Sequence, residues 1–249
     1  MKVYSIFMLR FASLIVFFLI GSCVSKYSGK GLSFESRSSV SRQDVLKIAE
    51  AYHSHRWVPS EKNIFHGVDD GGIRVDTPDI AYTDPGAERP GWWISNKKNT
   101  GIPYMWGGFD TPVSFEQKLS SGFYAGDIYS SEKRRLLDDG VSLQACGIDC
   151  SGFISRCWRL ERSFSTRELP ALSNELASFK ELQPGDIVNQ SNVHCLLFVK
   201  FLGSERKSFL AYETGSPPSW KVLKHPISVD YVKGLGYRPY RYKNIEAGE

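Results

Sequence analysis

Cys150 is the residue whose type and position are best suited to chemistry, and it lies in the segment GIDCSGFISRCW, residues 147–158. A thiol there could fill a buried space, form half of a disulfide, bind a metal or attack an electrophile. Apolar residues recur after it at helical spacing, which predicts a helix that begins at Cys150 with Asp149 as its N-cap. A thiol in the first turn lies at the positive end of the helix dipole, beside unused backbone N–H groups. Both effects favour the thiolate, so the position suits a nucleophile.

Such a nucleophile needs a basic partner, because the neighbouring carboxylate of Asp149 raises the pKa of the thiol. His194 opens an apolar, β-rich run and is one candidate. His225 is the rival, and we expect it in a polar loop because Pro226 follows it. Alternation in the run places His194 on one face of the predicted strand, together with every second residue after it.

A carboxylate for the histidine is expected on the next strand. The runs VHCLLFVKF (193–201) and SFLAYET (208–214) predict two strands of a hairpin. Their pairing would bring Glu213 towards His194, where it could orient the imidazole and stabilise its cation. Cys150, His194 and Glu213 are therefore the predicted triad of a cysteine hydrolase.

The remaining cysteines and the acids of one loop allow redox, structural or metal-binding roles besides catalysis. Cys146 and Cys157 flank the nucleophile and could be redox partners, whereas the apolar runs around Cys157 and Cys195 favour small buried thiols. The stretch 66–79 groups one histidine with several acids, as a metal site or a set of turns would. No Cys-x-x-Cys pair is present, and we expect neither a metal nor an organic cofactor.

Four segments, in this order, resemble the NlpC family of cell-wall cysteine peptidases: PYMWGG (103–108), DCSGF (149–153), LQPGDIV (182–188) and the strand that His194 opens. The resemblance implies that Cys150 is the nucleophile, that His194 is the general base, and that Tyr104, Asp149 and Ser151 line the substrate end of the cleft. It further implies hydrolysis of amide bonds in peptidoglycan stem peptides. Glu213 departs from the His, Asn or Gln common at its position.

The expected fold class is α+β. The resemblance implies a permuted papain-like domain over residues 101–249, in which an N-terminal helix carrying the nucleophile packs on a small antiparallel sheet. An insert at about 109–146 is longer than the family's usual gap and is expected to wall off or narrow the cleft. Residues 41–100 are predicted to form a helical and loop-rich N-terminal extension, which starts with a helix over residues 41–57 and continues irregularly.

The first 22 residues are typical of a signal peptide, with Lys2 and Arg10 around a short apolar core. The sequence IGSC that ends at Cys23 resembles a bacterial lipobox, which implies cleavage before Cys23 and its acylation. Residues 23–40 then form the lipidated cysteine and a flexible tether. We therefore expect an exported protein of the bacterial cell envelope, anchored to a membrane by lipid. The formal charge of +4 falls to about +2 without the signal peptide and does not favour nucleic-acid binding.

Two alternatives remain open from the sequence. One keeps the triad but changes the substrate, as in a papain-like amidase or acyltransferase that acts on a lipid or a protein. The other is a catalytically silent wall-binding lipoprotein that keeps the fold. The resemblance makes a cell-wall endopeptidase or amidase acting on stem peptides the preferred prediction. The presence of the cysteine, the histidine and the acid argues against the silent protein.

Overall fold

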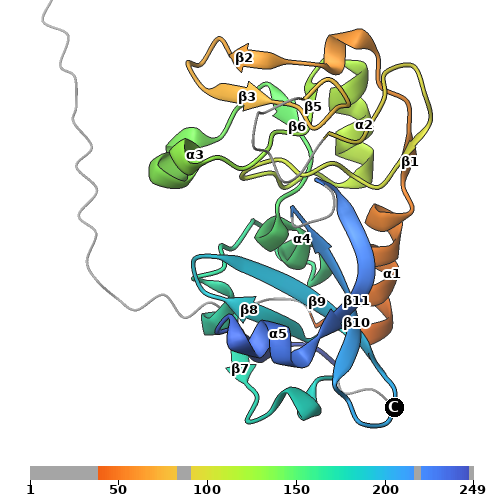
Figure 1. Cartoon of the computed structure of the whole chain (residues 1–249), viewed down its shortest axis with the longest axis vertical. Coiled ribbons are helices and arrows are strands. Elements are labelled where there is room, and N and C mark those ends of the chain that lie inside the picture. The colour runs from red at the N-terminus through yellow and green to blue at the C-terminus, as the bar shows by residue number, and fades with distance from the viewer. Residues whose placement is uncertain (1–38, 83–90, 216–219, 247–249) are drawn as a thin grey trace, which may run out of the picture. The chain divides into compact units, whose positions relative to one another are not determined.

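The computed structural model describes residues 39–82, 91–215 and 220–246, which belong to one compact unit (Figure 1). The predicted signal peptide, Cys23 and nearly all of the tether lie outside the described residues. Within the described part of the chain, no helix is both long enough and apolar enough to cross a membrane.

The α-helices are α1 (Arg42–His53), α2 (Pro112–Ser120), α3 (Ser131–Leu136), α4 (Cys150–Cys157) and α5 (Val229–Gly234). The strands before α4 are β1 (Arg56–Trp57), β2 (His66–Val68), β3 (Arg74–Asp76), β4 (Asn99–Thr100), β5 (Tyr124–Ala125) and β6 (Ala145–Cys146). Those after α4 are β7 (Ser173–Glu175), β8 (Ile187–Gln190), β9 (His194–Leu202), β10 (Ser208–Thr214), β11 (Val222–Ser228) and β12 (Arg238–Tyr242). The fold class is therefore α+β, as predicted.

A six-stranded antiparallel sheet follows α4 in the chain, with the order β11-β10-β9-β8-β12-β7. The predicted hairpin is present, because β9 pairs with β10. β12 is not paired with β11, the strand that precedes it in the chain. It pairs with β8 on one side and β7 on the other, so the last strand lies inside the sheet between two earlier strands.

Helix α4 packs against β9 and β10, and α1 packs against α4. The apolar stripe predicted for α4 is confirmed, because its members are fully buried: Phe153, Ile154, Cys157 and Trp158. The buried face of α1 belongs to the same hydrophobic core: Val45, Ala49 and Tyr52. The ring of Tyr52 meets Phe153 of α4 edge to face, with ring centroids 5.6 Å apart. Residues from the expected extension thus help to hold the helix that begins at Cys150.

Helix α1 begins as predicted but ends earlier. The Asp44 N–H donates to the Ser41 hydroxyl at 3.0 Å, which is an N-cap. The helix ends at His53 instead of continuing to Trp57. Ser54 is its C-cap, and the Ser54 N–H donates to the Glu50 carbonyl in the last turn. The next residues form β1, which pairs with β4. The prediction of a helix to residue 57 was therefore wrong.

The described residues between α1 and α4 are irregular apart from short elements. In the described part of the stretch expected to be irregular, β2 and β3 form a hairpin, and α2 and α3 follow it. Asp69 forms the turn of that hairpin, where its Oδ1 accepts the N–H groups of Gly71 and Ile73. Helices α2 and α3 precede α4, so the helix of the predicted nucleophile is not the first helix of residues 101–249. In Figure 1, α4 lies between this part of the chain and the six-stranded sheet.

Candidate active site

Cys150 is the first residue of α4, and its surroundings explain why the helix begins there. Asp149 is the N-cap, as predicted: its Oδ1 accepts the Gly152 N–H at 2.5 Å and the Ser151 hydroxyl at 3.1 Å. A Cβ at Gly152 would clash with the carbonyl oxygen of Gly108, so only glycine permits this close packing. Among the described residues, no hydrogen bond engages the backbone N–H of Cys150 or Ser151. These groups can donate to an oxyanion.

His194 begins β9, and its Nε2 lies 2.7 Å from Oε2 of Glu213 on β10. The other oxygen of Glu213 contacts Nε2 of His225. His225 is in β11, opposite Ala211, and the prediction of a polar loop was wrong. Pro226 is tolerated because β11 is an edge strand, where a missing N–H need not cost a ladder bond. Glu213 therefore bridges two histidines, of which His194 also bonds to Cys150.

The charges in this group stabilise one another. A hydrogen bond with the Cys195 thiol lowers the pKa of Cys150; burial opposes this, and the charge and hydrogen bond of His194 bring the pKa well below the ordinary thiol value. Burial lowers the pKa of His194, but the Cys150 charge and hydrogen bonds with Cys150 and Glu213 raise it to about 10. Burial likewise raises the pKa of Glu213, but the two histidines lower it to about 2. At neutral pH, the group is a thiolate, an imidazolium and a carboxylate.

Cys195 was predicted only as a buried thiol, and its contact with Cys150 was missed. It is 1% exposed, and its side chain belongs to the core against which Cys150 packs. Both its thiol and its backbone N–H bond to Cys150, which places two donors on the sulfur besides His194. The available signal was its position next to His194 in a strand that must cross the start of α4. Cys146, Cys150, Cys157 and Cys195 are all free thiols.

A cavity of about 780 Å³ opens at Cys150. It brings together all the predicted site residues that the structure describes: Tyr104, Asp149, Cys150, Ser151, His194 and Glu213. Tyr104 is 5% exposed and packs on Trp220, with ring centroids 5.3 Å apart. Burial and the Cys150 charge raise the pKa of Asp149 to about 7, although hydrogen bonds oppose them. Asp149 thus changes charge near neutral pH.

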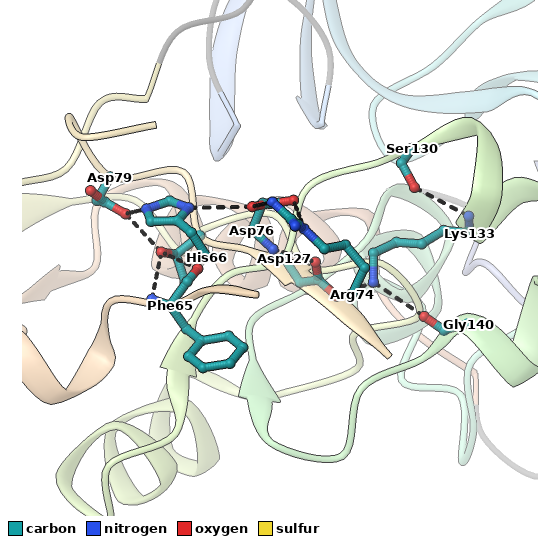
Figure 2. A network of polar contacts seen from close by, with 10 residues as sticks. Phe65, His66, Arg74, Asp76, Asp79, Asp127, Ser130, Lys133 and Gly140 are labelled. Carbon is teal, nitrogen blue, oxygen red and sulfur yellow. Dashed lines mark hydrogen bonds and ion pairs between the residues drawn. The ribbon is translucent and has the colours of Figure 1, made fainter. Parts of the chain in front are cut away.

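The insert forms one wall of this cavity, which it lines with residues of α3 and of the turns around it. The Trp106 indole N–H donates to the Leu137 carbonyl at 3.0 Å. Lys133 is buried in α3, where its ammonium lies 2.6 Å from Asp127 Oδ2 and 3.3 Å from the Gly140 carbonyl (Figure 2). These contacts involve residues before and after α3 in the chain, and they hold α3 in place beside the cavity.

The histidine considered for a metal site contacts two of the acids in the same stretch. The His66 ring lies between two carboxylates, with Nε2 2.9 Å from Asp79 and Nδ1 3.4 Å from Asp76 (Figure 2). Asp76 also forms a two-fold contact with Arg74, and its backbone N–H reaches Asp127. Within the described ranges, no group of three or more His, Cys, Asp or Glu side chains is arranged to hold a metal ion. The network instead ties the β2–β3 hairpin to the insert.

A partly exposed thiolate, an imidazolium and free N–H groups at one cavity are the parts needed to attack an acyl carbon. No protein-family model matches the chain, and no curated protein or solved structure shows significant similarity to it. The geometry of the site and the sequence motifs therefore carry the functional proposal.

Proposed function

We propose that the protein is a cysteine peptidase or amidase of the NlpC type with a permuted papain-like fold. Its reaction is the hydrolysis of amide bonds in peptidoglycan stem peptides through Cys150, His194 and Glu213. The observation that carries the proposal is the thiol at the start of α4, hydrogen-bonded to a histidine whose other contact is a buried carboxylate.

In the proposed reaction, the Cys150 thiolate attacks the carbonyl carbon of the amide and the carbonyl becomes an oxyanion beside the first N–H groups of α4. The His194 imidazolium gives its proton to the amide nitrogen, the C–N bond breaks, and an amine leaves. The acyl group remains on Cys150 as a thioester. Neutral His194 then takes a proton from water, which attacks the thioester and restores the thiolate and the imidazolium. Glu213 orients the ring and stabilises its cation throughout.

Asp149, Tyr104 and Ser151 are proposed to hold the amino end of the substrate. All three line the cavity next to Cys150, and Asp149 is partly exposed to it. A free α-amine beside the Asp149 carboxylate would form a charge-assisted contact. The enzyme then prefers released stem peptides with a free N-terminus to intact, glycan-linked wall.

Export and attachment to a membrane are proposed from residues 1–40, with Cys23 as the lipid-bearing residue. A diacylglycerol and an N-acyl chain together would give stable anchoring. The chemistry proposed for the site needs no metal and no organic cofactor.

Incubation with defined peptidoglycan fragments tests the function directly. Stem peptides with a free N-terminus, their N-acetylated forms and intact wall are each incubated with the wild type and with Cys150→Ala, and product masses are measured. We expect cleavage of the free peptides by the wild type only. If no fragment in the set is cleaved, or if a folded Cys150→Ala protein cleaves equally well, the proposal is wrong.

A second candidate is acyl transfer to or from a lipid or a protein. One observation favours it: the lining of the cavity includes four aliphatic residues, Leu196, Ile227, Val232 and Leu235. An acyl chain could pack on these residues in the cavity that also contains Cys150. Thioesters with short and long acyl chains would distinguish the candidates, because a lipid enzyme should acylate faster as the chain lengthens and leave stem peptides intact.

A catalytically silent binding lipoprotein is the third reading, and thiol reactivity tests it. The low pKa of Cys150 and its partial exposure favour fast alkylation at neutral pH. A thiol that reacts as slowly as an ordinary cysteine would favour the silent protein.

A further inference from the structure

His225 lies in the active site but has no role in the proposed reaction. It is opposite Ala211 in the edge strand β11, and Nε2 of its ring contacts Oε1 of Glu213. Because β9, β10 and β11 are neighbours in the sheet, His194, Glu213 and His225 form a row across three strands (Figure 1). The His225 side chain is 29% exposed, against 12% for His194, and it lines the cavity that contains Cys150. A ring in this position can reach both the buried carboxylate and solvent.

The ring of His225 interacts with the charges of the triad. The other charged side chains of β11 and of α5, which packs on it, pair elsewhere or are exposed: Lys224 pairs with Glu50, and Asp230 and Lys233 are exposed. The hydrogen bond and the charge of Glu213 raise the pKa of His225, although burial and the charge of His194 oppose this. The rise favours the protonated form of His225 near neutral pH, beside a carboxylate that also binds His194.

A carboxylate that binds two cations holds each of them less firmly than it would hold one. Glu213 is 4% exposed, and each of its two oxygens bonds to one of the rings. The positive charge of His225 weakens the attraction of Glu213 for the proton on His194, and it also repels that proton directly. This matters for acid catalysis, because an imidazolium with a pKa of about 10 is a weak acid at neutral pH.

We infer that His225 is a positioning residue, which shares Glu213 with His194 and so makes His194 a better proton donor to the leaving amine. The proton passes from His194 to the amide nitrogen as the C–N bond breaks, and Glu213 stays a carboxylate bound to His225. The inference deepens the proposed function and rests on it for the identity of the amine. A substrate whose leaving group needs no proton, such as an aryl thioester, should depend much less on His225.

The titration of His194 tests the inference without any substrate. In the full chain with Cys150→Ala, the charge that raises the pKa of His194 is gone, so the ring should titrate at lower pH. Histidine ring signals are followed by NMR in Cys150→Ala with and without His225→Gln, which removes the charge and keeps an N–H donor. His55→Gln is the matched control, because His55 also bonds to a glutamate, Glu116 at 2.9 Å, and lies outside the cavity lining.

We expect His225→Gln to raise the titration midpoint of His194 by about one pH unit, and His55→Gln to leave it unchanged. An unchanged midpoint in folded His225→Gln overturns the inference, whatever the substrate is. If His225→Gln does not fold, Cys150→Ala alone decides the matter. Both rings should then report two coupled titration steps, because they share one carboxylate, and two independent single-step curves would overturn the inference.

Rate measurements with Cys150 intact test the effect on proton donation. The ratio of kcat/KM for a cleaved stem peptide to kcat/KM for an aryl thioester of the same acyl group should fall about threefold in His225→Gln, since Brønsted behaviour transmits only part of a change in acidity. A change in the nucleophile affects both substrates and cancels from the ratio. A constant ratio overturns the role of His225 in proton donation. If the His194 midpoint shifts but no stem peptide is cleaved, the sharing of Glu213 stands and the proposed substrate is wrong.

Discussion

Substitution of His194 by alanine should change how the alkylation of Cys150 depends on pH. His194 contributes both a positive charge and a hydrogen bond to the lowered pKa of Cys150, whereas Cys195 contributes hydrogen bonds that the variant keeps. Burial, which raises the pKa of Cys150, remains in the variant. The pKa of the thiol should therefore rise towards its ordinary value.

The size of the effect follows from the thiolate fraction. A thiol with an ordinary pKa of about 8.5 is roughly 0.3% ionised at pH 6 and roughly 24% ionised at pH 8. Its alkylation rate should thus rise on the order of tenfold per pH unit across most of that interval. The wild type is largely thiolate throughout and should change far less. Above pH 9, His194→Ala should be alkylated faster than the wild type, because a thiolate of higher pKa is intrinsically the stronger nucleophile.

The assay is the rate of iodoacetamide incorporation between pH 5 and 10, measured by intact mass. Cys150→Ala sets the background of the other thiols, of which Cys146, Cys157 and Cys195 are buried. Cys195→Ala is the companion variant. It removes the thiol that donates to Cys150 and keeps the Cys150–His194 ion pair, so its pH profile should lie between those of the wild type and His194→Ala. Parallel profiles for the wild type and His194→Ala would refute the thiolate–imidazolium pair.

Three further substitutions test other parts of the site. Glu213→Gln should keep measurable activity, whereas the activity of His194→Ala should fall about 10²–10⁴-fold. The wild type should lose kcat/KM at alkaline pH near pH 10, and this loss should occur at lower pH in Glu213→Gln, because the glutamate helps to raise the pKa of His194. Equal, negligible losses in both variants would place the base elsewhere. Asp149→Asn should raise KM for peptides with a free amine and leave the melting temperature unchanged or higher, since burial disfavours the ionised carboxyl at neutral pH; equal rates on free and N-acetylated peptides would leave Asp149 as a cap only. Gly152→Ala should lower the free energy of unfolding by about 1–3 kcal/mol in denaturant melts, whereas Gly234→Ala, with open space around it, should not destabilise; equal melts would contradict the close packing at α4.

Local patterns predicted the parts of the site that lie on regular elements. The stripe after Cys150 gave the helix and its buried face, because helical spacing fixes which side chains share a side. Alternation along two runs placed Glu213 beside His194, because a hairpin pairs residues of adjacent strands. Both inferences need only contacts between neighbours in the chain or across one turn.

The parts that depend on distant contacts were missed. His225 read as a loop residue because proline usually ends a strand, and an edge position is visible only once the sheet order is known. The contact of Cys195 with Cys150 was missed although Cys195 follows His194, because only the packing of β9 on α4 shows that its side chain reaches the Cys150 sulfur.

The most direct test of the central claim is to trap the acyl group on Cys150. A stem peptide with a free N-terminus is mixed with excess enzyme, quenched in acid within milliseconds to seconds, and the intact protein mass is measured. We predict a transient mass increase equal to the acyl fragment, located on the peptide that contains Cys150, with the amine product released in equal amount. Cys150→Ala should show neither the adduct nor the amine. Release of the amine by folded Cys150→Ala, or turnover by the wild type with the adduct on another residue, would contradict covalent catalysis by this cysteine.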